Sequence, residues 1–117
     1  MLTAHHVNAF LVVGVCVISA AAAFIAYRRR GPAGRFVAQL LALAQTLLVA
    51  QVGMGLLLLG DHRRASDRLH YLYGALALLT TLSPWLYAPG DPRRRLLWFG
   101  GATLVAAALA VRAYLTA

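Results

Sequence analysis

The chain has 117 residues, of which 62% are hydrophobic and only 12% are charged. A soluble domain carries about 25% charged and 45–50% apolar residues, so this composition excludes an ordinary water-soluble fold, and its apolar content excludes a disordered segment. The eleven basic residues are all arginine and outweigh three acidic residues, for a formal charge of +8. Because almost all of these arginines fall in short gaps between apolar runs, we expect them to face lipid headgroups and no nucleic acid.

Four apolar runs follow one another along the chain, and each predicts a membrane-crossing helix. A crossing takes about 20 apolar residues, and the predicted helices cover about 4–28, 36–60, 67–89 and 95–116. Gaps this short make consecutive helices antiparallel. The sequence therefore predicts one all-α domain over 1–117, an integral membrane four-helix bundle in up-down-up-down order.

Proline and the small residues predict details of this bundle. Pro84 should kink the third helix near its end, with the freed carbonyl groups satisfied by Thr80, Thr81 or their neighbours. Small residues at helix surfaces favour close helix contacts, and the candidates are Gly14, Ala20 to Ala23, Gly53, Gly55, Gly74, Gly100 and Gly101.

The arginines also predict the direction of insertion. The gaps after the first and third helices hold seven arginines, and the other side holds four, at 63, 64, 68 and 112. The positive-inside rule places the richer side in the cytoplasm, so both termini are expected outside. This topology describes a multi-pass protein of the cell membrane, which in a bacterium is the inner membrane.

All four histidines fall on the predicted outer side. His5 and His6 open the first helix, His70 opens the third, and His62 lies in the gap between the second and third. Helices 1 and 3 lie diagonally opposite in a simple bundle, roughly 11–14 Å apart. That separation leaves room for a flat macrocycle, so we expect His6 and His70, with His5 as the alternative to His6, to be the metal ligands of a b-type heme.

Three further residues are expected beside such a heme. Gly74 lies one helical turn from His70 and would leave space for a porphyrin edge. Arg64 and Arg68 lie at the outer rim, where heme propionates need cationic partners. Each also has a plain structural interpretation, because glycine favours packing and rim arginines commonly meet lipid phosphate.

Two glutamines interrupt the second apolar run. Gln45 and Gln51 are amides inside a membrane helix, and such groups normally face the bundle interior and find a partner. Gln51 lies over Gly55, four residues on. Its partner can be a ligand imidazole, a quinone carbonyl or another helix, so a quinone is a second candidate cofactor.

The stretch from Gln51 through Gly55 to Leu69-His70 resembles one half of heme A synthase. Enzymes of that family consist of two related four-helix halves, each with a histidine near the outer end of its first helix, a Gln-x-x-x-Gly helix and a third helix that opens with Leu-His. The resemblance implies that His6 (or His5) and His70 bind heme. The chain lacks the Glu before and the Arg after the first-helix histidine of that family, so heme binding is implied in preference to heme modification.

The sequence thus predicts a small heme-binding protein or subunit that transfers electrons on the outer side of the membrane and is not an enzyme on its own. It would act with other membrane subunits or as a homodimer, which would reproduce the two-half architecture. The alternative is a cofactor-free accessory or assembly subunit of a larger membrane complex. A proton-coupled exporter is disfavoured because all three acidic residues, Asp61, Asp67 and Asp91, fall in gaps.

Overall fold

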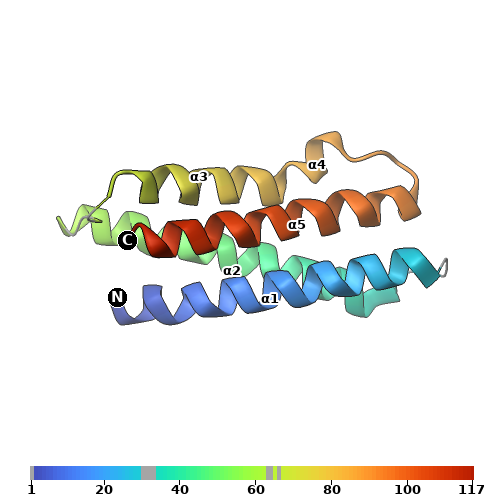
Figure 1. Ribbon diagram of the computed structural model, residues 1–117, viewed down its shortest axis with the longest axis horizontal. Helices are drawn as coiled ribbons and strands as arrows, with labels where there is room; N and C mark the ends of the chain where they lie inside the picture. The colour runs from blue at the N-terminus through green and yellow to red at the C-terminus, as the bar shows by residue number, and fades with distance from the viewer. Residues whose placement is uncertain (1, 30–33, 63–64, 66) are drawn as a thin grey trace.

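A computed structural model describes residues 2–29, 34–62, 65 and 67–117, and all the regular elements within them are helices. In chain order these are α1 (Leu2–Arg29), α2 (Gly34–Gly60), α3 (Leu69–Leu82), α4 (Pro84–Tyr87) and α5 (Pro92–Leu115). Successive long helices run in opposite directions, and both ends of the chain lie at the same end of the bundle (Figure 1). The predicted all-α, four-helix architecture is confirmed, with α3 and α4 together taking the place of one helix.

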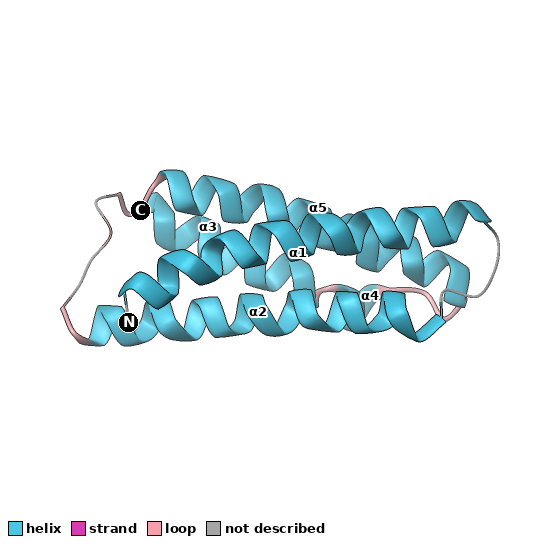
Figure 2. Ribbon diagram, turned by 90° about the horizontal axis from the view of Figure 1, so that it is seen from below, coloured by secondary structure: helices cyan, strands magenta, loops and turns pink. Residues whose placement is uncertain are grey.

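The four long helices form a bundle that measures 48 × 23 × 19 Å. α1 packs against α2 and α5, and α3 packs closely against α5 but only loosely against α2. α1 and α3 therefore occupy opposite corners, as the simple bundle predicts (Figure 2). The loose α2–α3 side matters for the site described below.

Many residues in the interior of the bundle are small or polar, although Leu41, Leu48 and Phe99 are also buried, and many large apolar side chains point outward. The buried residues of α1 recur every three or four positions, as one face of a helix requires: His5, Asn8, Val12, Cys16, Ser19, Ala20 and Ala23. Large side chains such as Phe10 and Phe36 are 63% and 71% exposed. A soluble monomer rarely exposes apolar surface on this scale, whereas lipid accommodates it.

Three helices, α1, α2 and α5, are long and apolar enough to cross a membrane. Their 24 to 28 residues correspond to about 36–42 Å of helix, against about 30 Å for the bilayer core. The 14 residues of α3 reach only about 21 Å.

The third predicted helix, 67–89, is shorter and broken, because Pro84 ends α3 instead of only kinking it. Proline has no N–H to donate to the carbonyl of Thr80, four residues earlier. Ser83 supplies the replacement, since its backbone N–H and its hydroxyl donate to the Thr80 oxygen at 3.3 and 2.8 Å. The freed carbonyl is thus satisfied by a neighbour, not by a threonine hydroxyl.

Close helix contact through glycine occurs at two positions. A Cβ at Gly100 would stand 3.0 Å from the Cβ of Ala23, so this glycine allows α5 to approach α1. A Cβ at Gly55 would stand 3.3 Å from Cε1 of His5. The packing role predicted for other glycines is not found within the chain, because an added Cβ would meet open space or a cavity: Gly14, Gly53, Gly74 and Gly101.

Candidate functional site

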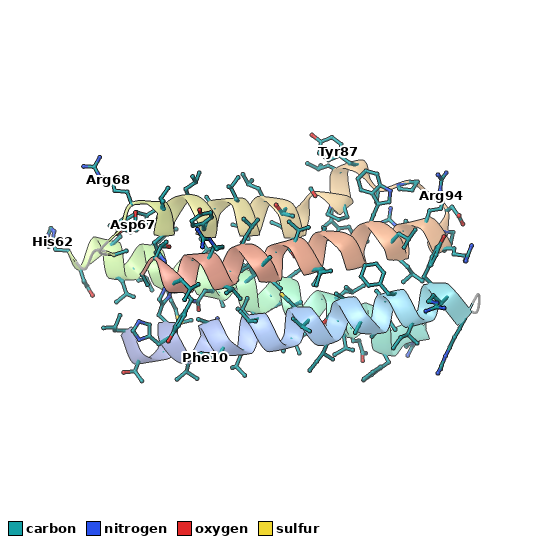
Figure 3. The ribbon with its side chains drawn as sticks, viewed as in Figure 1. Phe10, His62, Asp67, Arg68, Tyr87 and Arg94 are labelled. Atoms are coloured by element: carbon teal, nitrogen blue, oxygen red, sulfur yellow. The ribbon has the colours of Figure 1, made fainter. Side chains whose placement is uncertain are left out.

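The two ends of the bundle differ in chemistry. We call the end that carries His5, His6, His62 and His70 the histidine end. The opposite end, which we call the arginine end, carries Arg28, Arg29, Arg35 and Arg93 to Arg95. In Figure 3, His62 and Arg68 mark the first and Arg94 marks the second.

A cavity of about 420 Å³ lies within the histidine end and is lined by α1, α2, α3 and α5. This volume is within the range of about 300–1,000 Å³ typical of ligand sites. The loose packing of α2 on α3 provides the space. Most of the lining is apolar, and the predicted site residues that line it are His5, His6, Gln51, His70 and Gly74.

The imidazole of His70 is held from α5. Its Nδ1 is within hydrogen-bond distance of the backbone oxygen of Ala113. A carbonyl oxygen only accepts, so Nδ1 carries the proton and Nε2 keeps its lone pair. A backbone carbonyl at Nδ1 is the usual way in which proteins orient a histidine that binds metal through its other nitrogen.

The imidazole of His5 is buried and points toward His70. Its side chain is 9% exposed, and the two ring centres are 6.1 Å apart with the rings at 69°. Nε2 of His5 lies 3.4 Å from Nε2 of Gln51. Nδ1 of His5 is buried and has no hydrogen-bond partner. An unpaired buried polar atom costs about 1–3 kcal/mol, and so it calls for an explanation.

A chain of side-chain amides fixes His5 from α2. Nδ2 of Asn8 donates to the carbonyl of Leu47 and to Oε1 of Gln51, both at 3.0 Å. Because Oε1 of Gln51 accepts from Asn8, the amide nitrogen of Gln51 faces His5 and donates to Nε2. Gly55, one turn further along α2, leaves room for the ring. The Gln-x-x-x-Gly spacing thus places both residues against the same imidazole ring, that of His5.

The helix phase at the start of α1 differs from the expected one. His5, not His6, faces His70 from the buried side of α1, whereas His6 is exposed and its ring lies 6.5 Å from that of Tyr114. His6 still contributes to the lining of the cavity. His62 is exposed in the turn after α2, with a φ of 62°, and does not line the cavity.

Arg68, one of the two arginines expected to pair with a propionate, does not lie at the cavity. Arg68 immediately precedes α3, where its side chain is exposed and projects away from the bundle (Figure 3). It does not line the cavity. Arg64 lies outside the described residues.

Asn8 and the carbonyl of Ala113 are the site groups that sequence reasoning missed. A signal for Asn8 was present, because it follows His5 by three residues and so shares its helix face. Ala113 acts through its backbone, and no side-chain pattern points to a carbonyl group.

Gln45, the second glutamine of α2, serves the fold. Its Nε2 donates to the Thr81 carbonyl at 3.3 Å, and its Oε1 accepts from Nε1 of Trp85 at 2.9 Å. Trp85 also meets the ring of Phe99 edge-on, with centres 5.1 Å apart. Of the predicted alternatives, Gln45 therefore pairs with another helix.

Within the described ranges, no group of three or more His, Cys, Asp or Glu side chains is arranged to hold a bare metal ion. No protein-family model, curated protein or solved structure matches the chain. The geometry of the histidine end is therefore what a functional assignment can use.

Proposed function

We propose that the chain is a four-span membrane protein that holds a b-type heme at its histidine end, where His5 and His70 would bind its iron. The observation that carries the proposal is the pair of imidazoles that face each other beside a cavity, each with an Nε2 that carries a lone pair. In holding a metal, Nε2 of His5 would exchange its hydrogen bond from Gln51 for the metal, and Nδ1 of His5 would keep the proton.

The spacing of the two rings fits a shared metal ion. Metal–imidazole bonds are about 2.0–2.1 Å long and a ring centre lies about 1 Å beyond its nitrogen, so two imidazoles on one ion have centres about 6 Å apart. The rings of His5 and His70 are 6.1 Å apart. Two protein ligands suffice for a heme iron, because the macrocycle supplies the remaining four.

The residues around the pair would determine how the heme behaves. The Ala113 carbonyl keeps His70 in one tautomer, and Gln51 with Asn8 holds the ring of His5. Apolar lining excludes water, and burial together with hydrogen bonding sets the potential of a bis-imidazole heme. A heme bound here carries one electron at a time. Gly74 contributes open space to the same cavity.

The membrane setting follows from the outward apolar surface and the distribution of arginine. We propose that 69–87 completes a fourth crossing, through α3 and α4 together. The positive-inside rule then puts the arginine end in the cytoplasm and the histidine end, with both termini, outside. The heme would exchange electrons with a partner on the outer side, and the resemblance to one half of heme A synthase is part of this proposal.

A cofactor-free subunit of a larger membrane complex is the second candidate. The observation that favours it is that Gly14, Gly53 and Gly101 face open space on the described surface. Glycine on an outward helix face permits close approach of a further helix. That helix would belong to a different subunit or to a second copy of the chain.

The two candidates are separated by absorption spectroscopy of the purified protein. After expression with ample heme, we expect a b-type reduced-minus-oxidised spectrum and about one heme per chain by pyridine hemochrome. His5→Ala and His70→Ala should each abolish or convert that spectrum, whereas the exposed control His62→Ala should retain it. A colourless protein would overturn heme binding, and in that case a co-purifying quinone would identify the other ligand expected for the cavity.

His6→Ala sharpens the test. We expect a normal spectrum, because His6 lies on the exposed side of α1. Loss of the spectrum in His6→Ala, with His5→Ala unaffected, would contradict the assignment of His5 as the ligand.

A further inference from the structure

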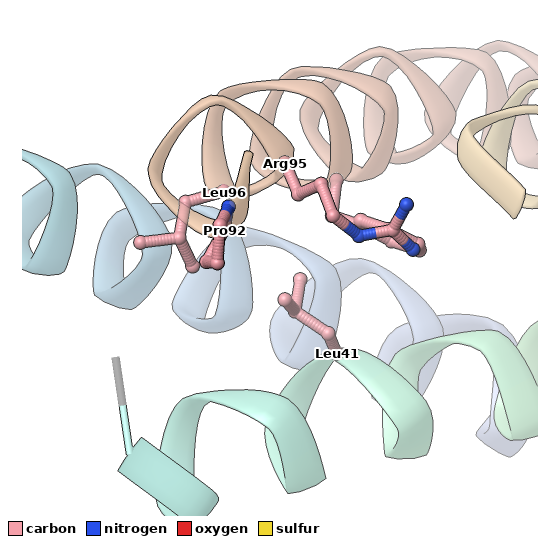
Figure 4. Close-up of a pocket in the computed structure, with 5 residues that line it drawn as sticks. Leu41, Pro92, Arg95 and Leu96 are labelled. Atoms are coloured by element: carbon pink, nitrogen blue, oxygen red, sulfur yellow. The ribbon is translucent and has the colours of Figure 1, made fainter. Parts of the chain in front are cut away.

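A second cavity lies at the opposite end of the molecule and is independent of the histidines. It is a cleft of about 290 Å³ between α2 and α5, and Figure 4 shows its lining residues, Leu41, Pro92, Arg95, Leu96 and Phe99. We call it the arginine groove. Four of its five residues are apolar and the fifth is a cation, so the groove is suited to a molecule with an apolar part and an anionic part.

The arginine end has a large excess of positive charge. Its only acidic residue in the described ranges is Asp91, whose carboxylate accepts a hydrogen bond from the backbone N–H of Arg93 and caps α5. Within those ranges Asp91 pairs with no arginine side chain. The positive charge of this end is therefore not neutralised by acidic side chains in the described ranges.

Arg93 and Arg95 differ in how many hydrogen bonds their guanidinium groups make within the fold. Arg93 donates from Nε and Nη2 to the carbonyl of Tyr27, at 3.4 and 3.2 Å, and stacks 4.0 Å above the Tyr27 ring. Its guanidinium joins α5 to the end of α1.

The side chain of Arg95, by contrast, makes a single hydrogen bond among the described residues, from Nη1 to the Pro89 carbonyl at 3.4 Å. Its guanidinium lies 5.3 Å from the ring centre of Phe99, in the groove. A guanidinium has five N–H donors in a planar fork that matches a phosphate. Near the hydrocarbon region, donors without acceptors are costly. Most of the fork of Arg95 is thus available to an anion.

We propose that the arginine groove binds an anionic phospholipid, with the phosphate on Arg95 and an acyl chain against Leu41 and Leu96. Anionic lipids give the cytoplasmic leaflet its negative surface potential, and this is the leaflet that the proposed topology assigns to the arginine end. The inference rests on the membrane topology proposed above but not on heme.

The test compares lipids and matched variants of the full chain in a neutral detergent. We expect phosphatidylglycerol to raise the Tm and to be retained in native mass spectrometry, whereas phosphatidylcholine should do neither, because a ligand that binds only the folded state stabilises it. Arg95→Gln should weaken the apparent affinity by about tenfold or more, since a bidentate charge-assisted contact is lost. Arg94→Gln removes the same charge from an exposed neighbour outside the groove and should have little effect. Equal losses in the two variants would overturn the proposal in favour of diffuse charge attraction.

Two further measurements test the acyl chain. Leu96→Trp fills the groove at constant charge and should also weaken phosphatidylglycerol binding, with Leu41→Phe as a substitute if circular dichroism shows that Leu96→Trp misfolds. Glycerol 1-phosphate carries the anion without the chain, so an equal rise in Tm would overturn the acyl part. Arg95→Gln should leave the heme spectrum unchanged, so failure of the heme proposal and failure of this one are separate results.

Discussion

Gln45 and Gln51 lie six residues apart on α2, and yet they belong to different kinds of structure. Gln45 joins α2 to the Thr81 carbonyl and to Trp85, so that both the nitrogen and the oxygen of its amide are used between helices. Gln51 is equally well bonded, but its amide leads to His5, where one nitrogen remains unpaired beside a cavity.

The difference teaches how to recognise a site in an apolar bundle. A polar residue in a membrane helix needs a partner, and both polar atoms of the Gln45 amide find one within the fold, whereas the buried hydroxyls of Thr81 and Thr103 have none. At the histidine end the chain of hydrogen bonds stops at an imidazole. An unpaired buried atom marks a place where a ligand is expected when it lies beside a cavity, and this holds for His5 but not for the two threonine hydroxyls.

The largest change in the free energy of unfolding that we expect is at the close contact between α1 and α5. Gly100→Leu should destabilise the bundle by about 1–3 kcal/mol, because its side chain would collide with Ala23 across the α1–α5 contact. Thermal unfolding in detergent measures this. Gly101→Leu is the matched control, with open space at the neighbouring position, and should change the Tm little. Equal losses would show that α1 and α5 do not depend on this contact.

At the histidine end, Gly55→Ala should weaken heme binding by about tenfold, because groups that orient a metal ligand contribute on this scale. The added methyl would stand 3.3 Å from Cε1 of His5 and displace the ring.

Gly74→Ala meets no protein atom and should leave the Tm unchanged, but it should reduce heme content because it narrows the cavity. Heme titration of the apoprotein measures both. Gly53→Ala, outside the cavity on α2, should bind heme normally; a loss there would contradict a role specific to the cavity.

Gln45→Leu tests the hydrogen bonds that join Gln45 to Thr81 and Trp85. It would leave Nε1 of Trp85 without its hydrogen-bond acceptor, and we expect a loss of about 0.6 kcal/mol, with about 1.7 kcal/mol as the upper end for hydrogen bonds in membrane proteins. Unfolding in detergent gives the stability, and the emission of Trp85 should shift. Gln39→Leu, an exposed amide on the same helix, is the control. A heme spectrum altered by Gln45→Leu would contradict the separation of the two ends.

The smallest effect is expected at the break between α3 and α4. Ser83→Ala removes the hydroxyl that donates to Thr80, but the backbone N–H of Ser83 still serves that carbonyl. A loss of about 0.5 kcal/mol follows. Thr46→Ala, whose hydroxyl donates to Ala42 within its own exposed helix turn, should be neutral under the same unfolding conditions.

Most of the fold could be predicted from the sequence, because helix number and order depend on run length and gap length. The end of α3 could be predicted only as a kink. Whether Pro84 bends or ends a helix depends on whether a nearby group donates a hydrogen bond to the carbonyl that the proline leaves free. Here Ser83 donates to the carbonyl of Thr80. The short α3 and the four-residue α4 are the result.

The candidate site could be predicted as a set of residues but not in detail. The choice between His5 and His6 depends on helix phase, and α1 is apolar on all sides, so hydrophobicity does not distinguish its inner face. The spacing of its small and polar residues does, since His5, Asn8 and Val12 share a face with Cys16 and Ser19. Arg68 was misplaced because a long side chain at a helix start can point to either side.

Both tryptophans of the chain, Trp85 and Trp98, belong to the half of the bundle near the arginine end. Trp85 follows His70 by 15 residues and lies on α4, beyond the end of α3. Local changes around the histidines therefore leave the environment of the indoles alone, whereas a heme, which absorbs at their emission wavelengths, would quench them at a distance. The intrinsic fluorescence of the protein can therefore report on the two ends separately. A shift of the emission spectrum indicates a change at the arginine end, and a loss of intensity without a shift indicates that heme occupies the histidine end.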